Sequence, residues 1–347
     1  MTEMVKKPKL KKATSIDVAK AAGVSQSVVS RAFTPGGKIA PATRERVLEV
    51  AGKMGYQPNA MARGLVTQRS NIVGVVIGDI TNPFYPQVLM KFSEKLQAMG
   101  KQVLLLNISG DQSTDTALLL ALQYRVEAII VTSVTLTSNM SKAFTESGVP
   151  IIFFNRYVDL PGVVAVSCDN VGGGRDVADA LLHAGHRRFA YIGGKPDTST
   201  NQDRRKGFMD RLKESSFDLV FSVEKEYSYD WGYHTARYLL GQKERPDAVF
   251  CANDIIALGV LDAARQELGM RVPEEISVVG FDDIPAASWP AYALTTVMQP
   301  VDRMVDATLE VLVEQLRDTN ANRGVKLLSG ILVERASARL AALAEKI

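Results

Sequence analysis

Short apolar segments alternate with amphipathic ones from residue 71 almost to the end of this 347-residue chain, and this alternation limits the fold more than any other feature. The runs NIVGVVIG, QVLLLNI, AIIVTSV and VPIIFFN have the length and the residue types of buried strands. Between them, residues such as Val88, Phe92 and Leu96 have the spacing of an amphipathic helix. Strands that alternate with helices predict an α/β fold with a parallel sheet.

A second series of strand-like runs follows the first. It begins with VVAVSC and continues with RFAYIGG, DAVFCA and ISVVGF, with helical spacing near residues 177–184, 208–212, 231–240 and 255–268. We therefore predict two similar lobes in tandem, with a ligand cleft where the carboxyl ends of their strands face each other. The segment ILVERAS predicts a last strand, and Leu340, Leu343 and Ile347 are too few apolar positions for an additional helical bundle.

The stretch TSIDVAKAAGVSQSVVSRAF, residues 14–33, has a different character. Thr14 and Asp17 form the [ST]-x-x-[DE] pattern of a helix cap, and Gly23 is suited to end that first helix. Ser25 is a good N-cap for a second helix, whose apolar face holds Val29 and Ala32. Two short helices joined by a glycine turn predict a helix-turn-helix, although any small helical hairpin would share the pattern.

A third helix is predicted after a Pro-Gly-Gly loop. Pro41 suits its first turn, and its apolar positions are Val47, Val50, Ala51 and Met54. The segment from Asn59 to Leu65 then contains helix formers but is too short to be a stable helix alone. It is either a helix that needs a partner or a plain interdomain linker.

Charge is distributed unevenly along the chain. Residues 1–70 hold thirteen Lys and Arg against four Asp and Glu, whereas the remainder holds 28 against 34. A basic amino-terminal module on an acidic body is expected of a nucleic-acid-binding protein with a second function. The lysines among residues 6–12 predict a flexible arm that attracts phosphates. No apolar run is long enough to span a bilayer, so a cytoplasmic location is expected, and Cys168 and Cys251 are predicted to be buried thiols.

The run DVAKAAGVSQSVVSRAF resembles the headpiece of the lactose-repressor (LacI/GalR) family of bacterial transcription regulators, in which IxDVAxxAGVSxxTVSR is usual. Val28 departs from it, because the family commonly has Thr there. GHRRFAYIGG, RRKGF, ANDIIALG, ISVVGFDD and LTTVMQP also fit, so the resemblance covers residues 14–336. It implies a headpiece, a hinge helix that orders on DNA, and a two-lobed core like that of periplasmic sugar-binding proteins.

These observations define the expected domains and DNA contacts. We expect a flexible arm over 1–13, a helix-turn-helix domain over 14–57, a hinge helix and linker over 58–70, and a two-lobed effector-binding and dimerisation domain over 71–347. The resemblance implies that Leu65 inserts into the minor groove of the DNA. Other proteins that bend DNA from the minor groove insert apolar residues in the same way. The residues expected to contact DNA are Thr14, Ser25, Gln26, Ser27, Ser30, Arg31, Asn59, Met61, Ala62, Arg63 and Leu65.

The expected effector site consists of side chains just past strand ends, and the resemblance implies contacts from Arg204, Asn253 and Asp282 to effector hydroxyls. Each of these side chains could instead cap a helix or form an ordinary ion pair. The expected set is Phe84, Tyr85, Asn155, Arg156, Asp169, Arg204, Asn253 and Asp282. A sugar or sugar phosphate is the favoured effector.

Enzyme signatures are incomplete in this sequence. It lacks GxxxxGK[ST], GxGxxG and GxSxG, and no nucleophile or metal-ligand set accompanies Asp282 and Asp283. We expect no cofactor and no metal. The predicted function is a ligand-responsive, homodimeric repressor of a pseudo-palindromic operator. The alternatives are an activator of the same family, a cytosolic sugar-binding protein and, from a different class, an enzyme.

Overall fold

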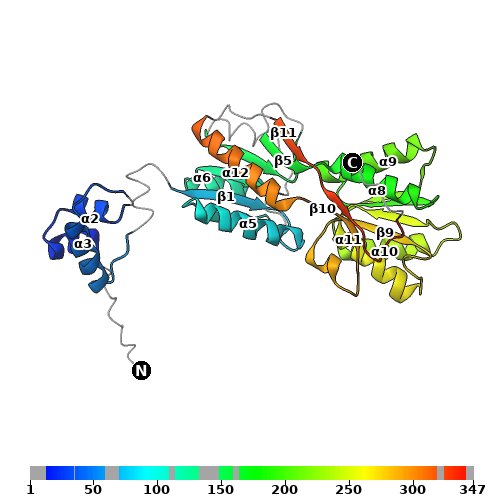
Figure 1. The fold of residues 1–347 in the computed structure, drawn as a ribbon, viewed down its shortest axis with the longest axis horizontal. Helices are drawn as coiled ribbons and strands as arrows, with labels where there is room; N and C mark the ends of the chain where they lie inside the picture. Colours follow the sequence, from blue (N-terminus) through cyan, green and yellow to red (C-terminus); the bar gives the residue numbers. More distant parts are fainter. Residues whose placement is uncertain are drawn as a thin grey trace, which may run out of the picture. The chain divides into compact units, whose positions relative to one another are not determined.

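The computed structural model describes residues 13–34, 36–58, 70–108, 114–132, 148–158, 164–318 and 324–340. Contacts within the chain divide it into two units, 1–70 and 71–347. Figure 1 shows the first unit in dark blue and the second in cyan to red. Each unit is described separately below.

Three helices form the first unit: α1 (Ser15–Ala22), α2 (Gln26–Ala32) and α3 (Pro41–Lys53). Their core contains only valines and alanines as fully buried residues: Val18, Ala19, Ala22, Val29, Ala32, Val47 and Ala51. The rings of Phe33 and Tyr56 pack edge to face beside it, 5.7 Å apart. Met54 was expected in this core, but it lies one residue beyond the end of α3 and 36% of it is exposed, so the apolar face ends a turn earlier than predicted.

The first lobe of the second unit is a six-stranded sheet in the order β11-β5-β4-β3-β1-β2, and its strand pairs are parallel. Its strands are β1 (Ile72–Ile77), β2 (Gln102–Asn107), β3 (Ala128–Val131), β4 (Ile151–Phe154), β5 (Val164–Cys168) and β11 (Gly324–Leu328). The helices of this lobe are α5 (Phe84–Ala98), α6 (Thr114–Gln123) and α12 (Val301–Arg317). In Figure 1 the orange α12 lies among the cyan elements of this lobe.

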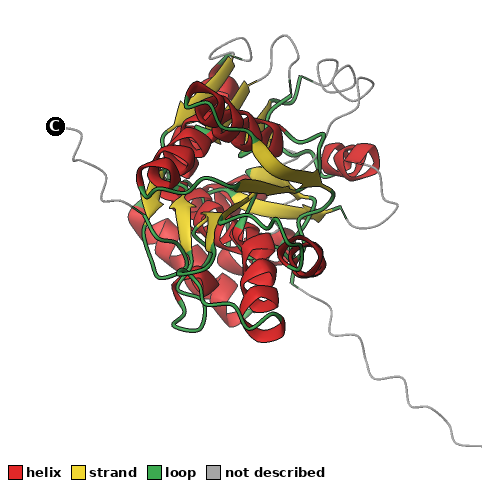
Figure 2. Ribbon diagram, turned by 90° about the vertical axis from the view of Figure 1, so that its right-hand side faces the viewer, coloured by secondary structure: helices red, strands yellow, loops and turns green. Residues whose placement is uncertain are grey.

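The second lobe repeats the same strand order, β12-β10-β9-β8-β6-β7. Its strands are β6 (Phe189–Gly193), β7 (Leu219–Glu224), β8 (Ala248–Cys251), β9 (Ser277–Asp282), β10 (Thr295–Met298) and the antiparallel edge strand β12 (Ile331–Val333). The helical segments are α8 (Asn170–His183), α9 (Ser199–Glu214), α10 (Tyr229–Leu240), α11 (Asp254–Asp262), η1 (Ala263–Glu267) and η2 (Pro285–Ser288). Figure 2 shows helices on both sides of the strands, as expected of doubly wound α/β lobes. The predicted tandem α/β fold is thus confirmed.

Two details of the predicted topology were wrong. The strand VVAVSC was expected to open the second lobe, but it is β5, which pairs with β4 and β11 in the first sheet. The single strand expected near the end of the chain is preceded by β11, so the tail supplies one strand to each sheet. The second error reflects pairing distant in sequence, because the partner of β11 is β5, which lies about 160 residues earlier.

The chain crosses between the lobes three times, after β5, after β10 and between β11 and β12. The crossings lie together at Gly330. A Cβ atom there would be 2.9 Å from the carbonyl oxygen of Met298 and 3.3 Å from the Sγ of Cys168. Only glycine fits without displacing a neighbouring segment. Cys168 and Cys251 are both free and buried, as predicted, and no helix in the described part of the chain is long and apolar enough to cross a membrane.

Candidate functional site

The first helix of the amino-terminal unit begins at the predicted cap. The Thr14 N–H donates to the Asp17 carboxylate at 2.9 Å, and the Asp17 N–H donates to Thr14 Oγ1 at 3.3 Å. Gly23 ends this helix with φ of 64° and ψ of 39°, the left-handed conformation that glycine adopts at no cost. The Thr14 side chain is therefore occupied by the cap.

Helix α2 directs an exposed polar face away from the valine and alanine core. Gln26, Ser27, Ser30 and Arg31 are all exposed. The Gln26 Nε2 donates to Ser15 Oγ at 2.9 Å, and the Arg31 Nε donates to the Ser27 carbonyl at 3.2 Å. These bonds hold two long side chains in place on the helix surface. The same face offers both donors and acceptors, which is what base edges in a major groove require.

Ser25 occupies the N-cap position of α2 but does not cap it. Its backbone is extended, yet its hydroxyl accepts no bond from a backbone amide of the first turn and instead lies 2.9 Å from the Ser27 hydroxyl. The predicted capping bond is therefore wrong. The amides of the first turn and two neighbouring hydroxyls together form a polar end of the helix, the kind of feature that binds phosphate oxygens in DNA complexes.

Arg44 was not predicted as part of this site, although it fixes the carboxyl end of α2. Its Nη1 donates to the carbonyl oxygens of Ala32 at 2.7 Å and Thr34 at 3.3 Å. Its Nη2 donates to the carbonyl oxygens of Gly37 at 2.8 Å and Arg31 at 3.5 Å. The guanidinium thus binds four carbonyl oxygens at the end of the helix and in the loop that follows it. Nothing local in the sequence distinguishes Arg44 from a surface arginine.

The expected hinge residues Asn59, Met61, Ala62, Arg63 and Leu65 lie outside the described residues.

In the two-lobed core, Arg204 and Asp282 form a buried ion pair. Arg204 Nη2 lies 3.2 Å from Asp282 Oδ1, and the two residues are only 2% and 7% exposed. The same guanidinium donates to Asn170 Oδ1 at 2.8 Å and to the Ala252 carbonyl at 2.6 Å. Its Cζ lies 3.7 Å from the centre of the Phe281 ring. Each of the three guanidinium nitrogens of Arg204 therefore has a partner in the protein, and Arg204 orients Asp282.

Three buried polar atoms at strand ends have no hydrogen-bond partner: Asn155 Oδ1, Asn253 Nδ2 and Gln299 Oε1. Asn155 follows β4 in the first lobe, whereas Asn253 follows β8 and Gln299 follows β10 in the second. Buried polar groups are nearly always paired, so unpaired ones call for an explanation such as an absent ligand or water. Two of these atoms accept hydrogen bonds and one donates. A ligand that pairs with all three must carry both donors and acceptors.

Two of the expected effector residues adopt a backbone conformation that is rare outside glycine. Asn155 has φ of 69° and Asp282 has φ of 122°. Such conformations cost free energy and cluster at binding sites, where the surrounding structure maintains them. Gln299 Nε2 donates to Asp282 Oδ1 at 2.7 Å. The unpaired amide oxygen of Gln299 and the carboxylate of Asp282, whose backbone is strained, therefore belong to one network.

Phe84 and Tyr85 lie at the start of α5 and pack edge to face, with ring centres 5.3 Å apart. They are 2% and 3% exposed. The Asn155 Nδ2 donates to the Tyr85 hydroxyl at 3.4 Å. Arg156 follows Asn155, and its Cζ lies 5.3 Å from the centre of the Tyr227 ring. The first two contacts join Phe84, Tyr85 and Asn155 of the first lobe into one group, whereas Arg156 contacts a residue of the second lobe.

Asp169 supports the more ordinary interpretation of strand-end polar residues. It is the N-cap of α8 and accepts a bond from the Gly172 N–H at 2.9 Å. Asn253 also caps a helix, since its Oδ1 accepts from the Ile256 N–H at 3.1 Å. Asn253 nevertheless retains an unpaired Nδ2, so capping accounts for only half of its amide.

Burial dominates the electrostatics of this region. It raises the pKa of the Asp282 carboxyl, and the positive charge of Arg204 opposes that shift. Burial, together with Asp282, raises the pKa of Asp254 well above its ordinary value. Asp254 is fully buried and accepts bonds from Thr296 Oγ1 at 2.5 Å and from the Ile284 N–H at 2.8 Å. It fixes the loop that follows β9 and lies behind Asp282.

Gln299, Tyr227 and Asn170 were missed by sequence reasoning. Gln299 lies directly after β10 in LTTVMQP, so the rule of polar residues past strand ends would have found it. Tyr227 lies in the short loop 225–228 between β7 and α10, and Asn170 lies in the first turn of α8. No local pattern marks either of them.

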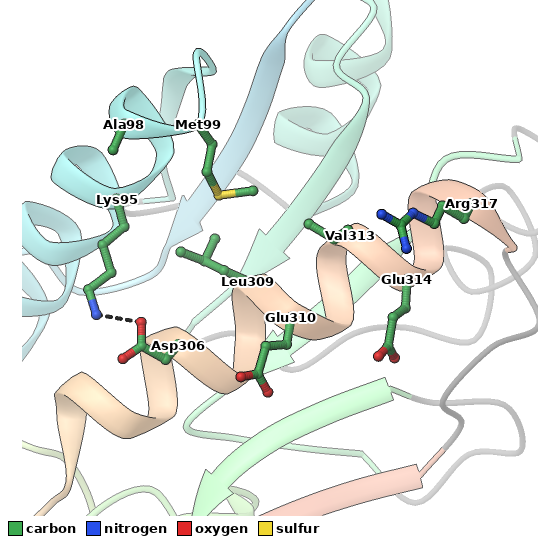
Figure 3. Close-up of a pocket in the computed structure, with 9 residues that line it drawn as sticks. All are labelled: Lys95, Ala98, Met99, Asp306, Leu309, Glu310, Val313, Glu314 and Arg317. Atoms are coloured by element: carbon green, nitrogen blue, oxygen red, sulfur yellow. Dashed lines mark hydrogen bonds and ion pairs between the residues drawn. The ribbon is translucent and has the colours of Figure 1, made fainter.

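A hollow of about 540 Å³ lies elsewhere in the first lobe, between α5 and α12 (Figure 3). Ala98, Met99, Leu309 and Val313 are among its lining residues, and Lys95 pairs with Asp306 at its side at 2.5 Å. No expected effector residue lines it. The described residues also contain no group of three or more His, Cys, Asp or Glu side chains arranged to hold a metal ion.

A helix-turn-helix unit on a core of two tandem α/β lobes defines a class of protein, the ligand-responsive DNA-binding regulators. Residues 15–59 match the family model of bacterial regulatory proteins of the lacI family, and residues 178–338 match a periplasmic binding protein-like domain. The chain is 34% identical to the HTH-type transcriptional regulator DegA of Bacillus subtilis over 299 residues, covering 84% of this chain and 88% of the relative.

Solved structures agree with this relationship. The lac repressor dimer bound to operator and the anti-inducer ONPF has a TM-score of 0.85 and 27% identity, covering 94% of this chain and 99% of that one. The complex of the transcriptional regulator CelR with cellobiose has a TM-score of 0.71 and 28% identity, covering 94% and 100%. This chain belongs to the lacI family of bacterial regulatory proteins, and it is a DNA-binding transcriptional regulator.

Proposed function

We propose that this regulator is a homodimeric repressor that reads each half of a pseudo-palindromic operator with α2. The observation that carries the proposal is the exposed polar face of α2, with Gln26 and Arg31 held in place by hydrogen bonds. A two-fold symmetric pair of reading helices requires a two-fold symmetric site. Activation of a promoter would use the same contacts and differ only in where the operator lies. The proposal also includes the expected hinge helix, in which Leu65 inserts into the minor groove of the operator.

The effector we propose is a small polyhydroxylated molecule bound at the strand ends of the two lobes. Asn155, Asn253 and Gln299 supply two acceptors and one donor, a combination that hydroxyl groups satisfy because each hydroxyl both donates and accepts. Arg204 is buried, and each of its three guanidinium nitrogens already contacts a protein group, Asn170, Ala252 or Asp282, which disfavours a role in binding phosphate. A neutral sugar is therefore favoured over a sugar phosphate. The cellobiose complex of a relative is consistent with this class.

The base-reading proposal predicts altered sequence preference. Gln26→Ala, Ser27→Ala and Arg31→Ala should each relax the preferred base at one position of the half-site, at about 1–3 kcal/mol per lost pairing. Selection from random DNA, followed by sequencing, gives the preference of each variant. Glu49→Ala is the control, because Glu49 is exposed on α3 and pairs with Lys53. If all three variants keep the parent preference, α2 is not the reading helix.

The effector proposal predicts that neutral sugars stabilise the protein more than their phosphates do. A thermal-shift screen of the full-length chain should identify at least one such sugar, because a ligand stabilises the folded state according to its occupancy. Gln299→Met should weaken the binding of that sugar by about fivefold, since one hydrogen bond is worth roughly 1 kcal/mol. Gln242→Met is the control, since Gln242 is exposed. Unchanged affinity in the Gln299 variant, or a stronger response to phosphates, would contradict the proposed site.

A further inference from the structure

Three consecutive residues after β4 each make a different connection. Asn155 directs an unpaired amide oxygen into the proposed effector site, and Arg156 lies over the ring of Tyr227. The Tyr157 N–H donates to Ser199 Oγ at 3.1 Å, and its hydroxyl donates to Asp203 Oδ2 at 2.7 Å. Tyr157 belongs to the first lobe, whereas Ser199 and Asp203 lie on α9 of the second lobe. Tyr157 therefore joins the two lobes by two hydrogen bonds.

The contact of Arg156 reaches the same helix. The Tyr227 hydroxyl lies 2.9 Å from Thr198 Oγ1 and 3.0 Å from Thr200 Oγ1, at the start of α9. The ring over which Arg156 lies is therefore fixed to α9. Arg156 and Tyr157 together connect the loop after β4 to the amino-terminal half of one helix in the other lobe.

Helix α9 also carries Arg204, which follows Asp203 directly and orients Asp282. A movement of α9 away from Tyr157 would thus also move the side chain that positions the Asp282 carboxylate. Asp203 is partly buried, and burial raises its pKa while the Tyr157 hydroxyl opposes the shift. A phenol donating to a partly buried carboxylate is one of the stronger kinds of hydrogen bond.

We propose that Tyr157 and Asp203 are positioning residues, whose hydrogen bond forms a latch between the lobes and sets how often the ligand-free core adopts the arrangement in which Tyr157 contacts α9. The latch uses none of the three unpaired amide atoms of the proposed effector site. It acts on the population of the binding-competent state, and the apparent dissociation constant of any effector rises as that population falls. A substitution that weakens or strengthens the Tyr157–Asp203 hydrogen bond would therefore change the effector concentration to which the regulator responds.

Spin-label distance measurements on the full-length chain without ligand or DNA test this inference. Gln123→Cys and Lys213→Cys place labels on exposed positions of α6 and α9, one in each lobe, while native Cys168 and Cys251 are buried. Tyr157→Phe removes only the hydroxyl that donates to Asp203. It should broaden the distance distribution and add a population displaced from that of the parent. Tyr238→Phe is the matched control, because 64% of Tyr238 is exposed.

A double-mutant cycle completes the test. If the hydroxyl acts through Asp203, Asp203→Asn should change the distribution in the same direction, and the double variant should differ little from the stronger single variant. A distribution in Tyr157→Phe identical to the parent's would overturn the proposal. Equal broadening in Tyr238→Phe would also overturn it, because the effect would then not depend on the latch. Neither outcome depends on DNA binding or on the identity of the effector.

Discussion

Arg204→Met should lower the free energy of unfolding of the two-lobed core by about 3–5 kcal/mol, because removal of one partner of a buried ion pair leaves the other charge uncompensated. The charge left behind is that of Asp282, which is 7% exposed. The variant also loses the bonds to Asn170 and to the Ala252 carbonyl. It should therefore lose its response to the effector as well. Urea unfolding gives the change in stability, and calorimetry gives the loss of effector binding.

The pH dependence of this effect has a definite sign. Burial already raises the pKa of Asp282, and Arg204 works against that shift, so the substitution should raise this pKa further. A carboxyl whose folded pKa is raised destabilises the protein as pH rises through that pKa, and this loss is absent below the unfolded pKa. The deficit of Arg204→Met should consequently be greatest near neutral pH and shrink toward pH 4, the usual pKa of an aspartate.

Arg205→Met is the matched control for this prediction. Arg205 is the next residue of α9, but its side chain is 38% exposed and its Nε lies 3.7 Å from Glu224. An exposed ion pair contributes about 0–1 kcal/mol, so stability should change little. Equal destabilisation by the two substitutions would mean that the helix tolerates neither, and that the buried pair has no special role.

Val47→Asp should unfold the helix-turn-helix unit while the core stays folded. Val47 is fully buried, and with Val18 and Val29 it provides most of the apolar volume in a core whose other buried residues are alanines. A buried unpaired carboxylate costs several kcal/mol, which is comparable to the whole stability of so small a domain. Operator affinity should fall by about two orders of magnitude or more, because each ~1.4 kcal/mol of unfavourable folding costs a factor of ten.

Leu48→Asp is the control for Val47→Asp. Leu48 is the neighbouring residue of α3, is 41% exposed, and should accept a charge with little loss of affinity. Gel-shift titrations measure DNA binding, and urea unfolding of the core measures whether the second unit is intact. If both variants bind DNA like the parent, the three helices do not form the DNA-binding unit.

The sequence predicted those parts of the structure that depend on neighbours along the chain. The Thr14 and Asp17 cap, the left-handed Gly23 and the strand-helix alternation are local patterns, and all three are present. The pairing of β5 with β11, about 160 residues later, could not be predicted, because tertiary packing decides such a contact.

The candidate effector site likewise has some features that the sequence predicts and others that it does not. Polar residues past strand ends are visible in the sequence, so Asn155, Asn253 and Asp282 could be named. Which of their atoms are already satisfied could not be known. Arg204 was expected to contact the effector, but each of its guanidinium nitrogens already contacts a protein group, whereas Gln299, which was not named, carries an unpaired amide oxygen.

The most direct test of the account is to identify the DNA that the full-length protein selects from a random pool and to count the protomers on it. We predict a pseudo-palindromic site with two protomers bound per duplex, because two copies of α2 related by two-fold symmetry must read two related half-sites. A single asymmetric half-site bound at full affinity by one protomer, or binding without sequence preference, would contradict it.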